Sequence, residues 1–162
     1  SQLAPKMIPS IQSLSESMSM SDSIEKLQNF IEENPDDFQA LKMLGLAQIG
    51  IGNVNESIKA FESAYLINSK DIDLLLQFSS AIAASQDGKF DGKSKVLIDE
   101  ALSLDPQSIQ VLYFSGIVAA HEGNLNGAIE FWEKALYLMS NDHPDRNIIE
   151  EALSTILNLQ VK

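Results

Sequence analysis

The sequence predicts an all-α fold of tandem helical hairpins, and three observations support it. First, an apolar-periodic pattern with a central glycine recurs at an offset of 71 residues, so that Gly45 matches Gly116. Second, this offset leaves room for one further copy between the two, stretched by three residues over the 34-residue period of helical-hairpin repeats. Third, each outer copy is preceded by two residues of which the second is Pro, at 34–35 and at 105–106. A residue before Pro disfavours the helical conformation.

Small and apolar residues at fixed positions carry a resemblance to the tetratricopeptide repeat (TPR), a 34-residue helix-turn-helix unit. The matching positions, in copies that begin at Phe38, Ile72 and Ile109, are Leu41, Leu44, Gly45, Phe61 and Ala64; Leu75, Phe78, Ala101 and Pro106; and Leu112, Gly116, Ala128, Trp132 and Ala135. The departures are Ser57 in place of Ala, Ser79 in place of Gly, and Ser69 and Ser140 in place of Pro. The resemblance implies an all-α TPR solenoid, a right-handed superhelix closed by a C-terminal capping helix.

The N-terminal segment, residues 1–21, is rich in Ser and contains Pro5 and Pro9, a composition typical of a linker. Apolar residues nevertheless fall there at helical spacing, at Ile8, Ile11, Leu14 and Met18. A short helix packed on the array or on a neighbouring molecule is therefore the alternative. A helix over 23–33 follows, with Asp22 or Ser21 as its cap, and opens the TPR domain over residues 22–162.

The repeats are predicted at about 38–71, 72–108 and 109–142, with the capping helix at about 145–160. Within them we expect helices over 38–50, 55–67, 72–84, 94–104, 109–121 and 126–139, and a last one from 145 or 147 to about 159. Gly52 suits a left-handed turn, and Asn53 or Asn55 can cap the helix after it. The longer connection over 85–93 is either a functional projection or a tolerated surface insertion.

Composition excludes several function classes. The chain has 162 residues, which fits one domain, and no cysteine, which excludes disulfides, a thiol nucleophile and cysteine-ligated zinc. Its net charge of −12 argues against nucleic-acid binding and is consistent with either solubility or attraction of a basic partner. No apolar run of 18 residues spans a membrane, and because the chain begins at Ser1 we expect a fragment of a longer protein.

No catalytic constellation is present in the sequence. His121 and His143 are isolated, and the motifs of metalloproteases, serine hydrolases and phosphate-binding loops are absent. Asp71 and Asp73 are neighbouring carboxylates, but acids at the start of a helix are explained by its dipole. We therefore predict a protein that is not an enzyme and has no metal or cofactor.

The concave face of a TPR array is lined by the first helix of each repeat, and from the positions that the resemblance implies there we predict ten groove residues. They are Gln39, Lys42, Leu46, Ile49, Asp73, Leu76, Ser80, Tyr113, Ile117 and His121. The clamp by which some TPR proteins hold a C-terminal carboxylate is not assembled, since Leu46 stands where Asn is needed. The mostly apolar groove suits an amphipathic helix, with Tyr113 as its anchor. The alternative is that some of these apolar residues belong to the core.

Two further stretches of the sequence resemble one particular group of TPR proteins. The connection and helix over 85–106, with the pattern from Phe114 to Trp132, resemble the periplasmic TPR domain of bacterial c-type cytochrome biogenesis proteins, which include accessory subunits of haem lyase complexes. This resemblance implies a domain that holds the C-terminal helix of an apocytochrome c while other haem lyase subunits attach haem. It also implies a location in the bacterial periplasm, anchored to the inner membrane by parts outside this fragment, which itself makes no direct membrane contact.

Two alternatives stay open. A related family member serves the maturation of a multihaem nitrite reductase, and the sequence does not separate the two roles. The chain could also be a structural TPR scaffold that joins subunits of a membrane-associated assembly and binds no free helix. An open apolar concave face would favour helix capture, whereas a filled concave face with an apolar convex patch would favour the scaffold.

Overall fold

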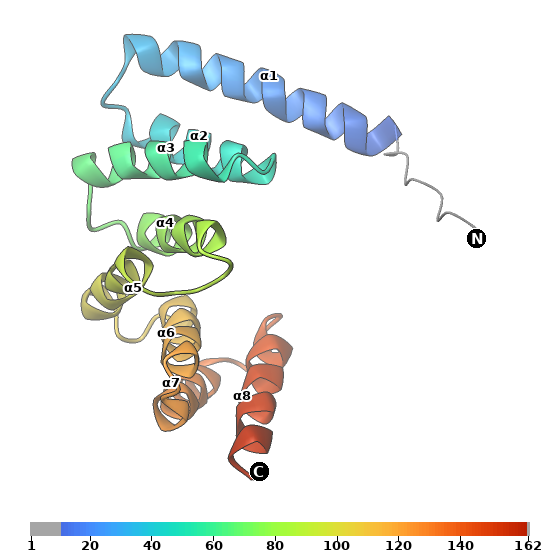
Figure 1. The fold of residues 1–162 in the computed structure, drawn as a ribbon, viewed down its shortest axis with the longest axis vertical. Helices are drawn as coiled ribbons and strands as arrows, with labels where there is room; N and C mark the ends of the chain where they lie inside the picture. Colours follow the sequence, from blue (N-terminus) through green and yellow to red (C-terminus); the bar gives the residue numbers. More distant parts are fainter. Residues whose placement is uncertain (1–10, 162) are drawn as a thin grey trace.

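The computed structural model describes residues 11–161, where the chain forms eight helices and no strand (Figure 1). The all-α prediction is confirmed. The helices are α1 (Ile11–Glu33), α2 (Phe38–Gly50), α3 (Val54–Ile67), α4 (Ile72–Ser85), α5 (Lys93–Leu104), α6 (Ile109–His121), α7 (Leu125–Leu138) and α8 (Arg146–Gln160). Each helix packs chiefly on its neighbours in sequence, so that α2–α3, α4–α5 and α6–α7 form hairpins stacked in a row. None of the described helices combines the length and hydrophobicity that a membrane span requires.

Side-chain caps explain why the first helix of each hairpin begins where the sequence predicts. Asp37 and Asp71 accept hydrogen bonds from the amides of Ala40 and Leu74 at 2.9 and 2.7 Å. Ser108 does the same for the third hairpin, through Val111 at 3.3 Å. Such caps satisfy amides that have no partner inside the helix. From α2 to α8, every helix end lies within one residue of its predicted position.

The helix α1 extends further toward the N-terminus than the helix predicted from 23, and it runs through most of the segment expected to be a linker. No Pro or Gly interrupts the chain between Ile11 and Glu33, and Ser23 donates its hydroxyl to the carbonyl of Ser19, a bond that helices tolerate. Ile24 is buried, and the methyl end of Met20 covers Gly50 of α2. Residues 1–10 of the expected linker lie outside the described residues.

Two glycines let the helices of the outer hairpins approach closely. A Cβ at Gly45 would lie 2.4 Å from the ring of Phe61, and one at Gly116 would lie 2.0 Å from the indole nitrogen of Trp132. That nitrogen donates a hydrogen bond of 3.0 Å to the backbone carbonyl of Tyr113. Any side chain at either position would therefore displace a buried ring.

Two of the serines that depart from the TPR pattern, Ser57 and Ser79, make buried hydrogen bonds. Ser57 of α3 donates to the carbonyl of Gly45 at 2.8 Å, and both groups are buried. In the middle hairpin the direction is reversed, because Ser79, which replaces the contact glycine, donates to the carbonyl of Ser94 at 2.7 Å. Each hydroxyl is paired across its hairpin, so these substitutions bury no unsatisfied donor.

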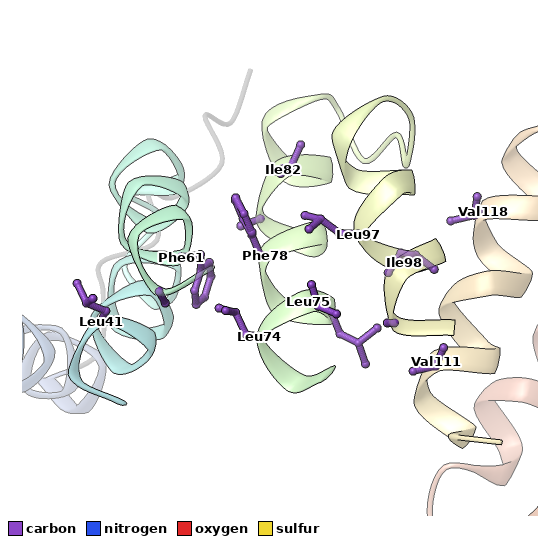
Figure 2. Packing of buried hydrophobic residues seen from close by; sticks show 14 residues of the cluster. Leu41, Phe61, Leu74, Leu75, Phe78, Ile82, Leu97, Ile98, Val111 and Val118 are labelled. Atoms are coloured by element: carbon purple, nitrogen blue, oxygen red, sulfur yellow. The ribbon is translucent and has the colours of Figure 1, made fainter. Parts of the chain in front are cut away.

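The core is divided between the two faces of α6. On one face Val111 and Val118 join a cluster that runs back through α5, α4 and α3 to α2, part of which Figure 2 shows. On the adjacent face Leu112 and Ala119 join a second cluster with α7 and α8. Because both clusters include α6, this helix connects the last hairpin and the final helix to the rest of the array.

We expect the alkaline limit of stability to depend on Tyr65. Its hydroxyl donates to both carboxylate oxygens of Glu100, at 3.0 and 3.1 Å, which joins α3 to α5. This hydrogen bond, then burial and the charge of Glu100, raise the pKa of Tyr65 above its ordinary 10.0. The folded chain therefore keeps a proton that the unfolded chain loses, and the stabilisation is complete below about pH 10 and declines above it.

The measurement is urea unfolding between about pH 9 and pH 11, a range that brackets the ordinary tyrosine pKa. Tyr65→Phe is expected to lose stability less steeply than the unsubstituted protein over this range. Tyr137→Phe is the matched control, because Tyr137 is 88% exposed. Equal slopes for Tyr65→Phe and the unsubstituted protein would contradict the assignment.

Candidate functional site

A cleft of about 490 Å³ opens where α2, α4, α6 and the start of α8 face one another. Its lining is mainly apolar. The residues are Leu46, Ile49, Phe61, Asp73, Leu76, Gln77, Ser80, Ala81, Ile109, Gln110, Tyr113, Phe114, Asp145, Ile148 and Ile149. The first helices of all three hairpins therefore contribute to one continuous site, together with the final helix.

The lining combines a rigid floor with accessible walls. Leu76 is only 4% exposed and belongs to the large core cluster, so its position is fixed by packing on all sides. Leu46 on α2 and Ile148 on α8 are 41% and 50% exposed and stand on opposite walls. Covering such side chains with an apolar partner releases water and is favourable. The cleft thus offers an open apolar surface on a preformed base.

Tyr113 is held at the cleft by the contacts of its neighbours on α6. Its backbone carbonyl accepts the indole N–H of Trp132, and its ring meets that of Phe114 edge-on, with centroids 5.8 Å apart. The side chain is partly buried, so one part of the ring remains available to a ligand. A rigid aromatic ring of this kind loses little conformational entropy on binding.

An acidic pair at the start of α4 holds the one lysine beside the cleft. Lys42 of α2 lies 2.6 Å from Asp73 and 3.2 Å from Asp71, and its side chain is 12% exposed. Burial by itself lowers the pKa of Lys42, but hydrogen bonds to Asp73 and Asp71 and their charges outweigh it, so the pKa is raised. Lys42 therefore stays protonated, and its charge is neutralised locally by the two carboxylates.

Several polar side chains line the cleft together with Asp73. The amide nitrogen of Gln77 donates to the Asp73 carboxylate at 3.1 Å, while its amide oxygen is buried without a hydrogen-bond partner. Asp145 precedes α8 and makes no side-chain cap to that helix. Ser80 donates to the carbonyl of Leu76 at 2.8 Å and has no hydrogen to spare. Asp73, Gln77 and Asp145 thus present oxygen acceptors to the cleft.

Six of the ten residues predicted for the groove line this cleft: Leu46, Ile49, Asp73, Leu76, Ser80 and Tyr113. The other four lie elsewhere. Gln39 is exposed on α2, and Lys42 is engaged with its two aspartates. Ile117 packs against the cluster shared with α7 and α8. His121 lies beside Phe90, with ring centroids 6.1 Å apart, in a separate surface hollow next to the long connection.

The cleft also contains residues that the repeat positions do not predict. Gln77, Ala81, Ile109 and Phe114 of α4 and α6 line it, as do Asp145, Ile148 and Ile149 at the start of α8. The apolar periodicity of the final helix was visible in the sequence, but it indicated a cap for the open end. The structure gives α8 a second role, because its first turn forms one wall of the cleft.

The described part of the chain offers no alternative site for metal chemistry. Within residues 11–161, no group of three or more His, Asp or Glu residues is placed to hold a metal ion. His143 accepts the backbone N–H of Asp145 at 3.1 Å, which assigns it a local structural contact. Neither histidine lines the cleft, whose surface is mainly apolar with Asp73 and Asp145 as its charged residues.

Comparison with known proteins gives one consistent result. Residues 4–146 match the family described as "Cytochrome c-type biogenesis protein H TPR domain". Cytochrome c-type biogenesis protein CycH of Pseudomonas aeruginosa is 30% identical over 132 residues, which cover 82% of this chain and 32% of that protein. The chain spans about a third of the length of the cytochrome c-type biogenesis proteins it matches.

Solved structures share the fold at low sequence identity. The crystal structure of MamA has a TM-score of 0.74 at 17% identity, covering 95% of this chain and 86% of its own. The first TPR of Spaghetti (RPAP3), bound to an HSP90 peptide, has a TM-score of 0.66 at 16% identity, covering 77% and 94%. The predicted TPR solenoid is thereby confirmed.

Proposed function

Because this chain belongs to the family of cytochrome c-type biogenesis protein H TPR domains, we propose that its cleft holds the C-terminal helix of an apocytochrome c. In this role it keeps the unfolded cytochrome chain available while other haem lyase subunits attach haem. The domain contributes binding and no catalytic group. The TPR fold and the family assignment support an interaction module of this kind.

The observation that carries the proposal is the open apolar cleft shared by α2, α4, α6 and α8. An amphipathic helix binds by placing its apolar stripe in a groove, with anchors three and four residues apart. Leu46 and Ile148 on the walls and Tyr113 between them give such a stripe several contacts along one face. A flat or filled concave face would offer none of these contacts.

The location proposed for the domain is the bacterial periplasm. The relatives are cytochrome c-type biogenesis proteins, and the matched residues make up only about a third of their length, so further parts can supply a membrane anchor. We propose that such an anchor holds the domain at the inner membrane, close to the haem lyase subunits. The fragment itself needs no contact with lipid or nucleic acid for this role.

The test is calorimetric titration with a synthetic C-terminal helix of a c-type apocytochrome. We expect micromolar binding, and Tyr113→Ala is expected to weaken it by about 1 kcal/mol or more, roughly a fivefold rise in Kd. The loss follows from removing a central aromatic contact. Tyr137→Ala is the matched control, because Tyr137 is 88% exposed on α7 and does not line the cleft.

The possible results of this titration distinguish an error in the proposed binding site from an error in the proposed function. Binding that Tyr113→Ala and Tyr137→Ala leave equally strong would keep the function and exclude the cleft as its site. No binding to any such helix would favour the structural scaffold, for which two exposed apolar side chains on the second helices, Leu66 and Tyr137, offer a starting point. Circular dichroism of each variant verifies that the helices remain intact.

A further inference from the structure

We infer that the cleft selects an amphipathic helix that carries basic side chains along one flank of its apolar stripe. This inference rests on the proposed function and specifies the chemistry of the helix that the cleft accepts. Its basis is the charge around the cleft rather than the apolar floor, which any amphipathic helix would fit. The acidic residues concerned stand at the start of α4 and just before α8.

Both charged residues in the lining are acidic. Asp73 lies in the first turn of α4, with its side chain 57% exposed, and Asp145 precedes the first turn of α8 and is also exposed. A carboxylate that remains partly in water can pair with an incoming cation without the large cost of burying an isolated charge. The cleft therefore attracts a positive flank and repels a negative one.

The cations near the cleft do not cancel this charge. Lys42 faces two carboxylates, Asp71 and Asp73, and its single charge leaves that group of three with a net negative charge. Arg146 is directed away from the cleft, since it binds Glu150 at 2.9 Å and the carbonyl of Leu136 at 3.2 Å. The described cleft thus has no uncommitted cation that would prefer an acidic partner.

The hydrogen-bonding groups on this side favour a donor as well. Gln77 gives its amide hydrogen to Asp73 and keeps a buried oxygen that lacks a partner. An unpaired buried acceptor costs free energy that a donor could recover after a small side-chain rotation. Lysine and arginine carry only donors, so they match Gln77 and Asp73 together. Charge and hydrogen bonding therefore select the same class of side chain.

The test uses three synthetic helices with the same apolar stripe and with Lys, Gln or Glu at two flanking positions. Calorimetric titration of the protein is expected to give the tightest binding for the Lys helix, about three- to tenfold tighter than for the Gln helix. The Glu helix is expected to bind most weakly. Raising the ionic strength from about 0.01 to 0.15 M should narrow the difference, because the paired charges remain near water.

Isosteric variants of the protein show which carboxylates produce the preference for the Lys helix. Asp73→Asn and Asp145→Asn should each reduce the preference for the Lys helix, and the double variant should abolish it while still binding the Gln helix. Glu133→Gln is the control, because it removes the same charge from an exposed position on α7 outside the cleft. It should leave the preference unchanged.

The possible failures are distinct. Equal affinity for the Lys and Gln helices, or a preference that survives in the double variant, would overturn this inference and leave the proposed function standing. A preference that Glu133→Gln reduces as much as Asp73→Asn would also overturn it, because net charge alone would then explain the result. Failure of all three helices and of the apocytochrome helix to bind would overturn both.

Discussion

Replacing Phe78 by Ala is expected to lower the free energy of unfolding by about 3–5 kcal/mol, the largest loss predicted for this chain. The ring is fully buried in α4 and lies near that of Phe61 (Figure 2), with the centroids 6.3 Å apart. The centroid of the Tyr65 ring lies 6.0 Å from that of Phe78. The ammonium of Lys93 lies 4.9 Å from the Phe78 centroid. Truncation removes these contacts and leaves a cavity that the packed neighbours cannot fill.

Urea unfolding followed by helical circular dichroism measures the loss. Phe30→Ala is the matched control, because Phe30 is 47% exposed on α1 and its truncation opens no comparable cavity. We expect a loss below about 1 kcal/mol for that variant. Equal losses for the two substitutions would contradict the packing around Phe78.

Gly116→Ala is the second large effect, with an expected loss of about 2–3 kcal/mol. The added Cβ would lie 2.0 Å from the indole nitrogen of Trp132, whose ring is 4% exposed and enclosed by the second core cluster. The ring cannot move aside without losing its hydrogen bond to the carbonyl of Tyr113. The last hairpin must open, and this cost exceeds the gain in helix propensity.

Gly50→Ala is the control that changes helix propensity without a clash against a buried ring. Gly50 ends α2, and a Cβ there meets only the flexible end of Met20. Because alanine favours helix over glycine by up to about 1 kcal/mol, this variant should be neutral or slightly stabilised. A stabilised Gly116→Ala protein would show that α6 and α7 do not meet as closely as described.

The starts of α2, α4 and α6 were predictable because the first helix of each hairpin carries its own signal. Asp37, Asp71 and Ser108 cap the first helices, and the contact glycines mark the close approach of α2 to α3 and of α6 to α7. The N-terminal part of α1 was predicted only in part: the helical spacing of Ile11, Leu14 and Met18 indicated a short helix, but not one continuous with the helix from 23. Serine-rich composition suggested a linker, yet no helix-breaking residue separates Ile11 from the rest of that helix.

The cleft was predictable only in part. Repeat positions brought Leu46, Leu76 and Tyr113 together, since one face of each first helix points to the same side. They failed for Ile117 and His121, which lie near the C-terminal end of α6, where the helix packs on the last cluster or faces the long connection. The repeat positions did not predict Asp145 and Ile148, because these residues stand at the start of the final helix, outside the repeats.

The seam between α5 and α6 makes the array unequal along its length. Of the consecutive helix pairs, this one shares the least contact, whereas the pairs within hairpins are joined most extensively. Elements joined by few contacts open at lower free energy than the rest of a protein. The seam separates the hairpin that carries Leu76, on the floor of the cleft, from the hairpin that carries Tyr113, so an opening at the seam would act between these two parts of the lining. Bending at this seam would change the width of the cleft, so that it fits helices with larger or smaller side chains. The apolar surface on each hairpin would stay intact.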